Sequence, residues 1–253
     1  MDRSIQENLV EFNKNGYTVI RGALQVKEAE ALKRGVLEAM DGPGDGYRDG
    51  LRTRMFEKGE QFQRLIMQPG VVDLAEAVLG PKCHMFAMNA MRTPRGKGID
   101  NWHVDEELFF PLPEGVEFDP RMQMPTFLIT CIYYLVDVTE KMGPTQVIPG
   151  SHRSGQEPDP EHDSPLYKGQ GPVSILAKQG DCLIFTGQLW HRGARNESDE
   201  PRVVQQVMYG KRWISQRFYP FVNYKMPQEI VERWKEHPRM SRLLGMHPRG
   251  PYG

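Results

Sequence analysis

The chain has 253 residues, which suits one large domain or two small ones, and 39% of them are hydrophobic, enough for a packed core without disulfides. Its 32 basic and 33 acidic residues leave a formal net charge of -1. This balance argues against nonspecific nucleic-acid binding as the main role, because such binding needs a strong basic excess.

The first part of the chain, residues 1–82, has the pattern of a helical region. Apolar residues at helical spacing predict helices over 3–15, 24–40 and 70–79. A short strand is expected near residues 17–20, after a turn. The stretch 41–50 carries four glycines, a proline and three aspartates, which is typical of a loop.

From residue 83 to 215, short apolar runs alternate with turn-forming clusters, a pattern typical of a β-sandwich or barrel. Residues 216–253 are expected to form a helical tail, with Pro227 at a helix start and Gly245 after the last apolar pair. This order predicts an α+β protein, mainly β, with helices against one face of a jelly-roll-like double sheet. We expect one domain over residues 1–253.

The three cysteines, Cys83, Cys131 and Cys182, lie in apolar runs without metal-site spacing, and we expect buried thiols in a reducing compartment. The N-terminus carries acidic residues and no apolar run of the kind found in signal peptides. No apolar run reaches the roughly 18 residues of a membrane span. The sequence therefore predicts a cytoplasmic protein.

The stretch NWHVDEELFFP, residues 101–111, places His103 and Asp105 two residues apart, so on a strand both side chains share one face. His191 follows another strand-like run at the rim of the β core. Two histidines and one carboxylate form a facial triad with open metal positions, which suits non-haem Fe(II). The alternative is that His103 and Asp105 are solvated polar side chains of an ordinary strand.

Arg202 opens the run RVVQQVMYG beyond His191. A keto-acid cosubstrate needs a fixed donor for its distal carboxylate, and the planar guanidinium of arginine matches that group better than lysine does. The alternative for Arg202 alone is a surface ion pair. Its combination with the triad favours the carboxylate-binding interpretation.

Several of these motifs together resemble the phytanoyl-CoA dioxygenase superfamily. They are MGPTQVIPGSHR (142–153), WHVDEELFF (102–110), GDCLIFTGQLWHRGARN (180–196) and Arg202, and the resemblance extends over residues 8–213. It implies a double-stranded β-helix (jelly roll) enzyme that uses Fe(II), 2-oxoglutarate and O2. By this resemblance His103, Asp105 and His191 would be the iron ligands, and Arg202 would hold the C5 carboxylate of 2-oxoglutarate.

The resemblance implies further contacts with the cosubstrate. Asn89, Ile132 and Gly193 would lie beside it, Ile132 through packing only. A basic residue of the N-terminal region, Arg52 or Arg54 in LRTRMFE, would also contact the keto acid. Related halogenating enzymes have a small residue in place of the carboxylate, so Asp105 favours hydroxylation, desaturation or ring formation.

Three other residues near these motifs are expected to have structural roles. Trp102 and Trp190, each directly before a proposed ligand, would pack in the core and orient that ligand. His152 would hold a loop near the metal, because the preceding Pro149-Gly150 pair fixes a turn.

The substrate is expected to be a small molecule enclosed by loops 41–58 and 106–126, the second of which contains Phe109, Phe110 and Phe118. Basic residues near the expected entrance would suit an anionic or acyl-type substrate, or would be solvated charges of a hairpin; they are Arg92, Arg95 and Lys97.

The sequence therefore predicts a 2-oxoglutarate-dependent non-haem iron dioxygenase that oxidises an unactivated C–H bond, with succinate and CO2 as co-products. Two alternatives remain at this point. One is a cupin-like metal enzyme without 2-oxoglutarate, and the other is a catalytically silent jelly-roll binding protein.

Overall fold

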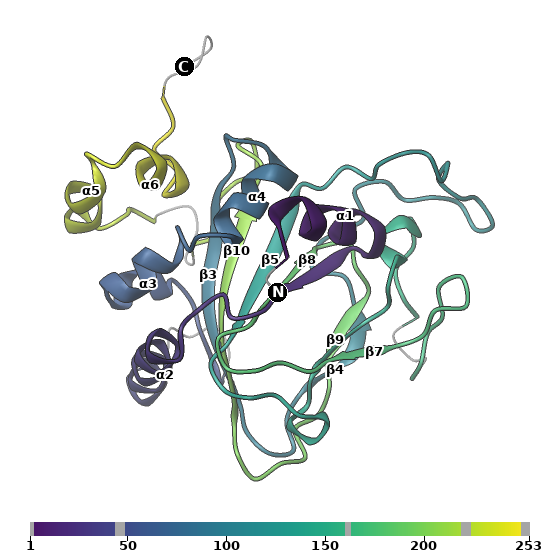
Figure 1. The fold of residues 1–253 in the computed structure, drawn as a ribbon, viewed down its shortest axis with the longest axis horizontal. Coiled ribbons are helices and arrows are strands. Elements are labelled where there is room, and N and C mark those ends of the chain that lie inside the picture. The colour runs from purple at the N-terminus through teal and green to yellow at the C-terminus, as the bar shows by residue number, and fades with distance from the viewer. Residues whose placement is uncertain (1–2, 44–48, 160–162, 219–223, 249–253) are drawn as a thin grey trace.

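The computed structural model describes residues 3–43, 49–159, 163–218 and 224–248. Two antiparallel sheets face each other, and most of the helices lie against the outer side of the larger sheet (Figure 1). The expected α+β class with mostly β structure is confirmed, because helices precede and follow the strands of the core. No helix among the described residues is long and apolar enough to cross a membrane.

The three helices predicted in the first part of the chain begin and end close to their predicted bounds. The helices are α1 (Ile5–Asn15), α2 (Val26–Asp41), α3 (Glu60–Leu65), α4 (Val71–Leu79), α5 (Gln228–Trp234) and α6 (Pro238–Leu243), with 3-10 turns at η1 (Met55–Lys58), η2 (Glu140–Met142) and η3 (Ser151–Arg153). A capping box formed by Ser4 and Glu7 starts α1, and Gly16 ends it in the left-handed conformation.

The larger sheet has the strand order β1-β8-β5-β10-β3-β2, and the smaller sheet has the order β4-β9-β6-β7. The bounds are β1 (Tyr17–Ile20), β2 (Leu51–Arg52), β3 (His84–Thr93), β4 (Ile99–His103), β5 (Leu128–Tyr134), β6 (Thr145–Val147), β7 (Val173–Ile175), β8 (Cys182–Thr186), β9 (His191–Gly193) and β10 (Arg202–Gly210). From β3 to β10 the chain passes from one sheet to the other at every step except that from β6 to β7, which brings distant motifs together.

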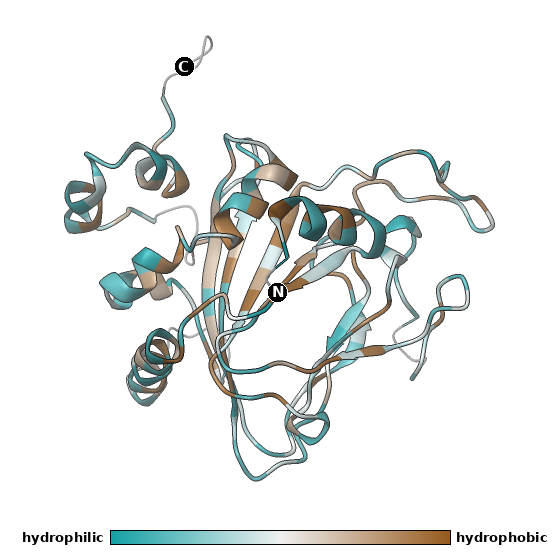
Figure 2. Cartoon of the chain, in the orientation of Figure 1, coloured by the Kyte–Doolittle hydropathy of each residue, from teal (hydrophilic) through white to brown (hydrophobic). Residues whose placement is uncertain are grey.

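The main hydrophobic core lies between the helices and the larger sheet. Alternate residues of β3, β5 and β10, including Met88, Tyr133 and Val207, pack against helical residues such as Leu74 and Phe62. Figure 2 shows hydrophobic colouring on these strands and hydrophilic colouring on much of the outward surface of the helices. The helices therefore hold the larger sheet rigid from its outer side.

A second core lies on the opposite face of the larger sheet, toward the smaller sheet. It contains Ile132, Leu183, Phe185 and Val204 from the larger sheet, with Val147 from the smaller one. The residues proposed as ligands lie between the sheets beside this core, so packing on both sides fixes their positions.

Some expectations need correction. Residues 51–58, expected as part of a loop that encloses the substrate, instead contain β2 and η1. Met55 and Phe56 are completely buried, because they belong to the core between the helices and the larger sheet. Residues 44–48 of the same loop lie outside the described residues. The sequence did not predict α3, whereas α5 and α6 lie within the predicted helical tail. Cys83, Cys131 and Cys182 are buried and free, as expected.

Candidate metal centre

His103 and His191 are brought together by the pairing of β4 with β9, in which they stand directly opposite each other. Their ring centroids lie 4.3 Å apart. Asp105 follows β4 by two residues, and one ligand atom from each of the three side chains lies within 4.8 Å of the others. The three residues predicted from the sequence therefore form one group that could hold a metal ion.

Both imidazole rings are oriented in the same way. Nδ1 of His103 lies 2.9 Å from the carbonyl oxygen of Asn101, and Nδ1 of His191 lies 2.9 Å from that of Leu189. A carbonyl can only accept a hydrogen bond, so each Nδ1 carries the proton. Each Nε2 is then left with a lone pair, which is the form that binds a metal.

The carboxylate of Asp105 is held by two other parts of the chain. Its backbone N–H donates to the carbonyl of Gly187 over 2.9 Å, and the hydroxyl of Thr130 donates to Oδ2 over 2.9 Å. Oδ1 lies 3.3 Å from Nε2 of His191. Thr130 thus occupies one carboxylate oxygen and leaves the other facing the histidines.

The charges of the group depend on one another. Burial by itself lowers the pKa of His191, but the adjacent Asp105 carboxylate outweighs burial, and the net pKa is raised. Burial likewise raises the pKa of Asp105, but His191, His103 and the Thr130 hydroxyl lower it overall. A concentrated negative charge beside two imidazoles is the electrostatic environment that attracts a cation.

Arg202 lies in a small cavity of about 80 Å³ that also reaches the triad. Its side chain is buried, and within the described part of the chain Nε and Nη1 have no hydrogen-bond partner. Its Nη2 donates to Thr93 over 3.5 Å. Burial lowers the pKa of Arg202. A buried guanidinium with two unused donors is costly unless an anion binds there.

Three other residues predicted to contact the cosubstrate line two adjoining cavities. Ile132 and Gly193 line the Arg202 cavity. Asn89 lines a second cavity of about 160 Å³, which shares Asp105 and Thr130 with the first.

Neither predicted basic residue of the N-terminal region lines these two cavities. The guanidinium of Arg52 donates to the carbonyls of Ala39, Met40 and Gly42, at the end of α2. Arg54 pairs with Glu57 and stacks on the ring of Tyr224. The structure therefore does not bring Arg52 or Arg54 to the metal group.

The second cavity has an apolar wall and a charged rim. Phe86, Ala87, Leu128 and Met208 form the wall, with Asn89, Thr53 and Thr130 as polar neighbours. Glu106 and Arg217 line the cavity as well and form an ion pair of 2.7 Å. Burial raises the pKa of Glu106, although Arg217 opposes the shift.

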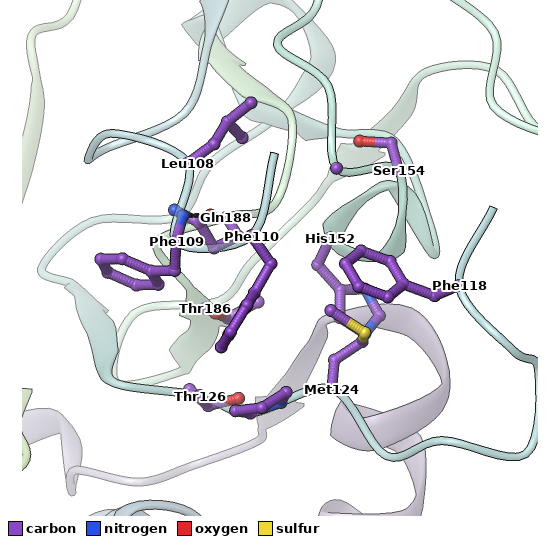
Figure 3. A pocket seen from close by; sticks show the side chains of 12 residues that line it. Leu108, Phe109, Phe110, Phe118, Met124, Thr126, His152, Ser154, Thr186 and Gln188 are labelled. Atoms are coloured by element: carbon purple, nitrogen blue, oxygen red, sulfur yellow. Dashed lines mark hydrogen bonds between the residues drawn. The ribbon is translucent and has the colours of Figure 1, made fainter. Parts of the chain in front are cut away.

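Loop 106–126 encloses a third, narrower cavity (Figure 3). The rings of Phe109 and Phe110 lie on one side, and Phe118 and His152 lie on the other. These phenylalanines line this cavity and neither of the two cavities at the triad, and their contact with a substrate stays a prediction. Phe109 also packs against the apolar wall of the second cavity, so the loop connects the two.

The residues expected to have structural roles are buried. The indole N–H groups of Trp102 and Trp190 donate to the carbonyls of Asp163 and Gln156. The hydroxyl of Ser151, next to His152, accepts from the backbone N–H of Trp190 over 2.9 Å. The turn that contains His152 therefore holds the residue directly before His191.

The basic residues at the end of β3 and just after it lie away from the metal group. Arg92 is within 3.8 Å of Asp41, Arg95 pairs with Asp199, and none of Arg92, Arg95 and Lys97 lines the two cavities at the triad. Of the two interpretations of these charges, the placement favours solvated charges of a hairpin.

Sequence reasoning missed four residues of the site: Thr130, Tyr134, Glu106 and Arg217. Thr130 and Tyr134 share a face of β5 with Ile132, and the single threonine within an apolar strand was a usable signal. The hydroxyl of Tyr134 donates to Thr145, a residue that lines the Arg202 cavity. The pairing of Glu106 with Arg217 had no signal in the sequence.

Comparison with known proteins identifies the family of this chain. The model of the phytanoyl-CoA dioxygenase (PhyH) family matches residues 12–204. The chain belongs to the phytanoyl-CoA dioxygenase family.

Three curated relatives illustrate the range of similarity. Dioxygenase af480 of Aspergillus fumigatus is 24% identical over 73% of this chain and 55% of its own length. The ectoine dioxygenase of Bordetella parapertussis is 30% identical over 49% of this chain and 42% of its own. Dioxygenase andF of Emericella variicolor is 30% identical over 96% of this chain and 85% of its own length. The chain thus spans about half the length of several curated relatives.

Solved structures share the fold at low sequence identity. HygX from Streptomyces hygroscopicus, with nickel and 2-oxoglutarate bound, has a TM-score of 0.65 at 17% identity, covering 84% of this chain and 89% of its own. The non-haem α-ketoglutarate-dependent epimerase SnoN from nogalamycin biosynthesis has a TM-score of 0.63 at 19% identity, covering 82% and 83%. These likenesses show a common fold.

Proposed function

We propose that this protein is an Fe(II)- and 2-oxoglutarate-dependent dioxygenase that oxidises a C–H bond of a small molecule. The observation that carries the proposal is the arrangement of His103, Asp105 and His191 beside the buried Arg202, whose Nε and Nη1 have no partner in the described residues. A metal-binding group and an unneutralised cation in one cavity suit a chelating dianion better than either feature alone does.

The residues fit both groups. Two imidazole nitrogens and one carboxylate oxygen are donors that suit Fe(II) and leave positions open for other ligands. Arg202 would hold the distal carboxylate of 2-oxoglutarate, while Ile132 and Gly193 would pack beside it. Asn89, in the adjoining cavity, would face the end of the cosubstrate near the metal. The structure lends no support to the same role for Arg52 or Arg54.

When bound, iron and 2-oxoglutarate supply the oxidation by O2, with succinate and CO2 as co-products. The chain positions the metal-binding side chains and shields the substrate cavity from water. The carbonyls of Asn101 and Leu189 hold the imidazole rings, and Thr130 holds the carboxylate of Asp105. The substrate would lie in the second cavity, beside Asp105. Loop 106–126 encloses the third cavity and packs Phe109 against the apolar wall of the second. Because Asp105 is present, we infer hydroxylation or a related oxidation rather than halogenation.

The strand arrangement supports a jelly roll within one domain. The eight strands β3 to β10 divide evenly between the two sheets, with four in the order β8-β5-β10-β3 and four in the order β4-β9-β6-β7. Eight antiparallel strands in two facing sheets are the arrangement of a jelly roll.

The proposal is tested by following succinate formation from 2-oxoglutarate with added Fe(II) while small-molecule classes are screened for stimulation. We expect His191→Ala to lose both iron binding and succinate formation. Turnover by His191→Ala would overturn the assignment of the triad. Metal binding without binding of 2-oxoglutarate would favour a cupin-like enzyme instead, and no binding of either would favour a silent binding protein.

A further inference from the structure

The rim of the second cavity already holds a cation of the chain itself. The guanidinium of Arg217 donates to Oε2 of Glu106 over 2.7 Å and lies 5.3 Å above the centre of the Phe86 ring. A carboxylate together with the face of an aromatic ring is a combination that binds ammonium and guanidinium groups. Glu106 and Phe86 therefore form a cation subsite, which we call the Glu106–Phe86 subsite.

The subsite belongs to the cavity at the proposed metal centre. Glu106, Phe86 and Arg217 line the same cavity as Asp105 and Thr130. Phe86 is turned toward this cavity by an irregularity in the β3–β10 pairing, in which Met208 is opposite Ala87 and Tyr209 is opposite Met85, so Phe86 is the extra residue. Such bulges re-aim a side chain, and here both Phe86 and Ala87 line the cavity.

The two members of the ion pair differ in how easily they can move. The Glu106 side chain is only 16% exposed, whereas that of Arg217 is 54% exposed. The backbone N–H of Arg217 is fixed by a 2.8 Å hydrogen bond to the carbonyl of Phe86, so displacement needs only the side chain to rotate. A half-exposed guanidinium loses little by moving into water, but a largely buried carboxylate left unpaired is costly.

Resting on the proposed function, we propose that the substrate carries a cationic nitrogen, such as an amine or amidine, which replaces the Arg217 guanidinium in the Glu106–Phe86 subsite. The apolar wall of Ala87, Leu128 and Met208 would then hold the hydrocarbon part of the substrate beside Asp105. An anionic substrate would instead need Arg217 and would leave Glu106 unpaired near the negative Asp105, which the burial of Glu106 disfavours.

The test uses three probes of similar size, cyclohexylmethylamine, cyclohexylmethanol and cyclohexaneacetate, and isothermal titration of protein loaded with Ni(II) and 2-oxoglutarate. Ni(II) in place of iron permits binding without turnover. We expect the amine to bind about tenfold more tightly than the other two, as suits a partly desolvated ion pair with an aromatic neighbour. Glu106→Gln should abolish this preference and leave binding of the alcohol unchanged.

Arg217→Gln distinguishes the alternatives. If Arg217 is the displaced occupant, its loss strengthens binding of the amine severalfold, whereas if it recognises anions, its loss weakens binding of cyclohexaneacetate. The matched control is Glu107→Gln, because Glu107 is the adjacent acid, is exposed and does not line the cavity; it should leave all three affinities unchanged.

Two results would overturn the inference: tightest binding of the carboxylate, or equal binding of all probes with no effect of Glu106→Gln. Binding of Ni(II) and 2-oxoglutarate is measured first in each protein, without a probe. If that binding fails in the unmodified protein, the proposed function is wrong; if it holds and the charge preference is absent, only this inference is wrong.

Discussion

The hydroxyl of Thr130 donates a 2.9 Å hydrogen bond to Oδ2 of Asp105, while Oδ1 of the same carboxylate faces His191 at 3.3 Å. Thr130 lies on β5 of the larger sheet, whereas His103 and His191 lie on the smaller sheet. This single hydrogen bond therefore couples the carboxylate to the rigid sheet that the helices support. It also selects which carboxylate oxygen is left for a metal.

Thr130→Val should weaken metal binding, because the isosteric side chain cannot orient Asp105. Loss of such an outer contact typically lowers metal affinity about 10–100-fold. Titration of the metal-free protein with Fe(II) under anaerobic conditions measures the change. Thr130→Ser retains the hydroxyl and should restore most of the affinity, so equal affinities of the valine variant and the unmodified protein would show that this hydrogen bond is unimportant.

Arg202→Met should remove the response to 2-oxoglutarate without destabilising the unliganded fold, because Nε and Nη1 of the buried guanidinium have no partner in the described residues. A ligand at about 100 times its dissociation constant adds about 2.7 kcal/mol to the free energy of unfolding. The melting temperature of Ni(II)-loaded protein, with and without 2-oxoglutarate, reports this effect.

The control for Arg202→Met is Arg195→Met, since Arg195 is an exposed arginine paired with Asp100. Arg195→Met should show the same rise in melting temperature on addition of 2-oxoglutarate as the unmodified protein. A full shift in Arg202→Met as well would mean that the carboxylate binds elsewhere.

Gly143→Ala should destabilise the fold more than Gly22→Ala. Both glycines have positive φ, +69° and +60°, but an added Cβ at Gly143 would overlap the backbone of Ala194 and Arg195, whereas at Gly22 nothing lies within 4 Å. The left-handed conformation alone costs an alanine about 1 kcal/mol. Denaturant unfolding should give about that value for Gly22→Ala and clearly more for Gly143→Ala; equal losses would contradict the close approach.

His152 should make the free energy of unfolding fall between neutral and acidic pH. Burial lowers the pKa of His152 from 6.5 to about 4, so the unfolded chain takes up the proton first. Stability present above pH 6.5 is then lost as the pH falls toward 4, by up to about 3 kcal/mol for this group. Unfolding titrations of His152→Gln should show a smaller loss over the same interval, and an unchanged pH dependence would contradict the account.

Most of the helices and the three residues of the metal-binding group could be predicted from the sequence because each leaves a local pattern. The apolar stripe of residues 24–40 predicts α2. The two-residue spacing of His103 and Asp105 indicates a shared site, but Asp105 lies beyond the end of β4. A hydrogen bond from its backbone N–H to Gly187 and one from the Thr130 hydroxyl to its carboxylate hold it beside the histidines. His191 was found through its place after a strand-like run. The registers that bring these residues together are long-range, however, and only the structure supplies them.

The remaining parts of the site depend on pairings that no local pattern records. Glu106 and Arg217 are 111 residues apart and meet only because the segment after β10 returns to β3. Arg52 was predicted to contact the cosubstrate and does not line the cavities at the triad. Its guanidinium instead donates to the carbonyls at the end of α2. Side-chain type alone could not distinguish these uses.

Binding of iron by the triad and of 2-oxoglutarate by Arg202 is measured together by the visible absorption that Fe(II) and 2-oxoglutarate give when they chelate in the protein under anaerobic conditions. We expect a weak band that requires both additions, is absent in His191→Ala, and needs more 2-oxoglutarate in Arg202→Met. Iron binding at His103, Asp105 and His191 with no band at saturating 2-oxoglutarate would contradict the account.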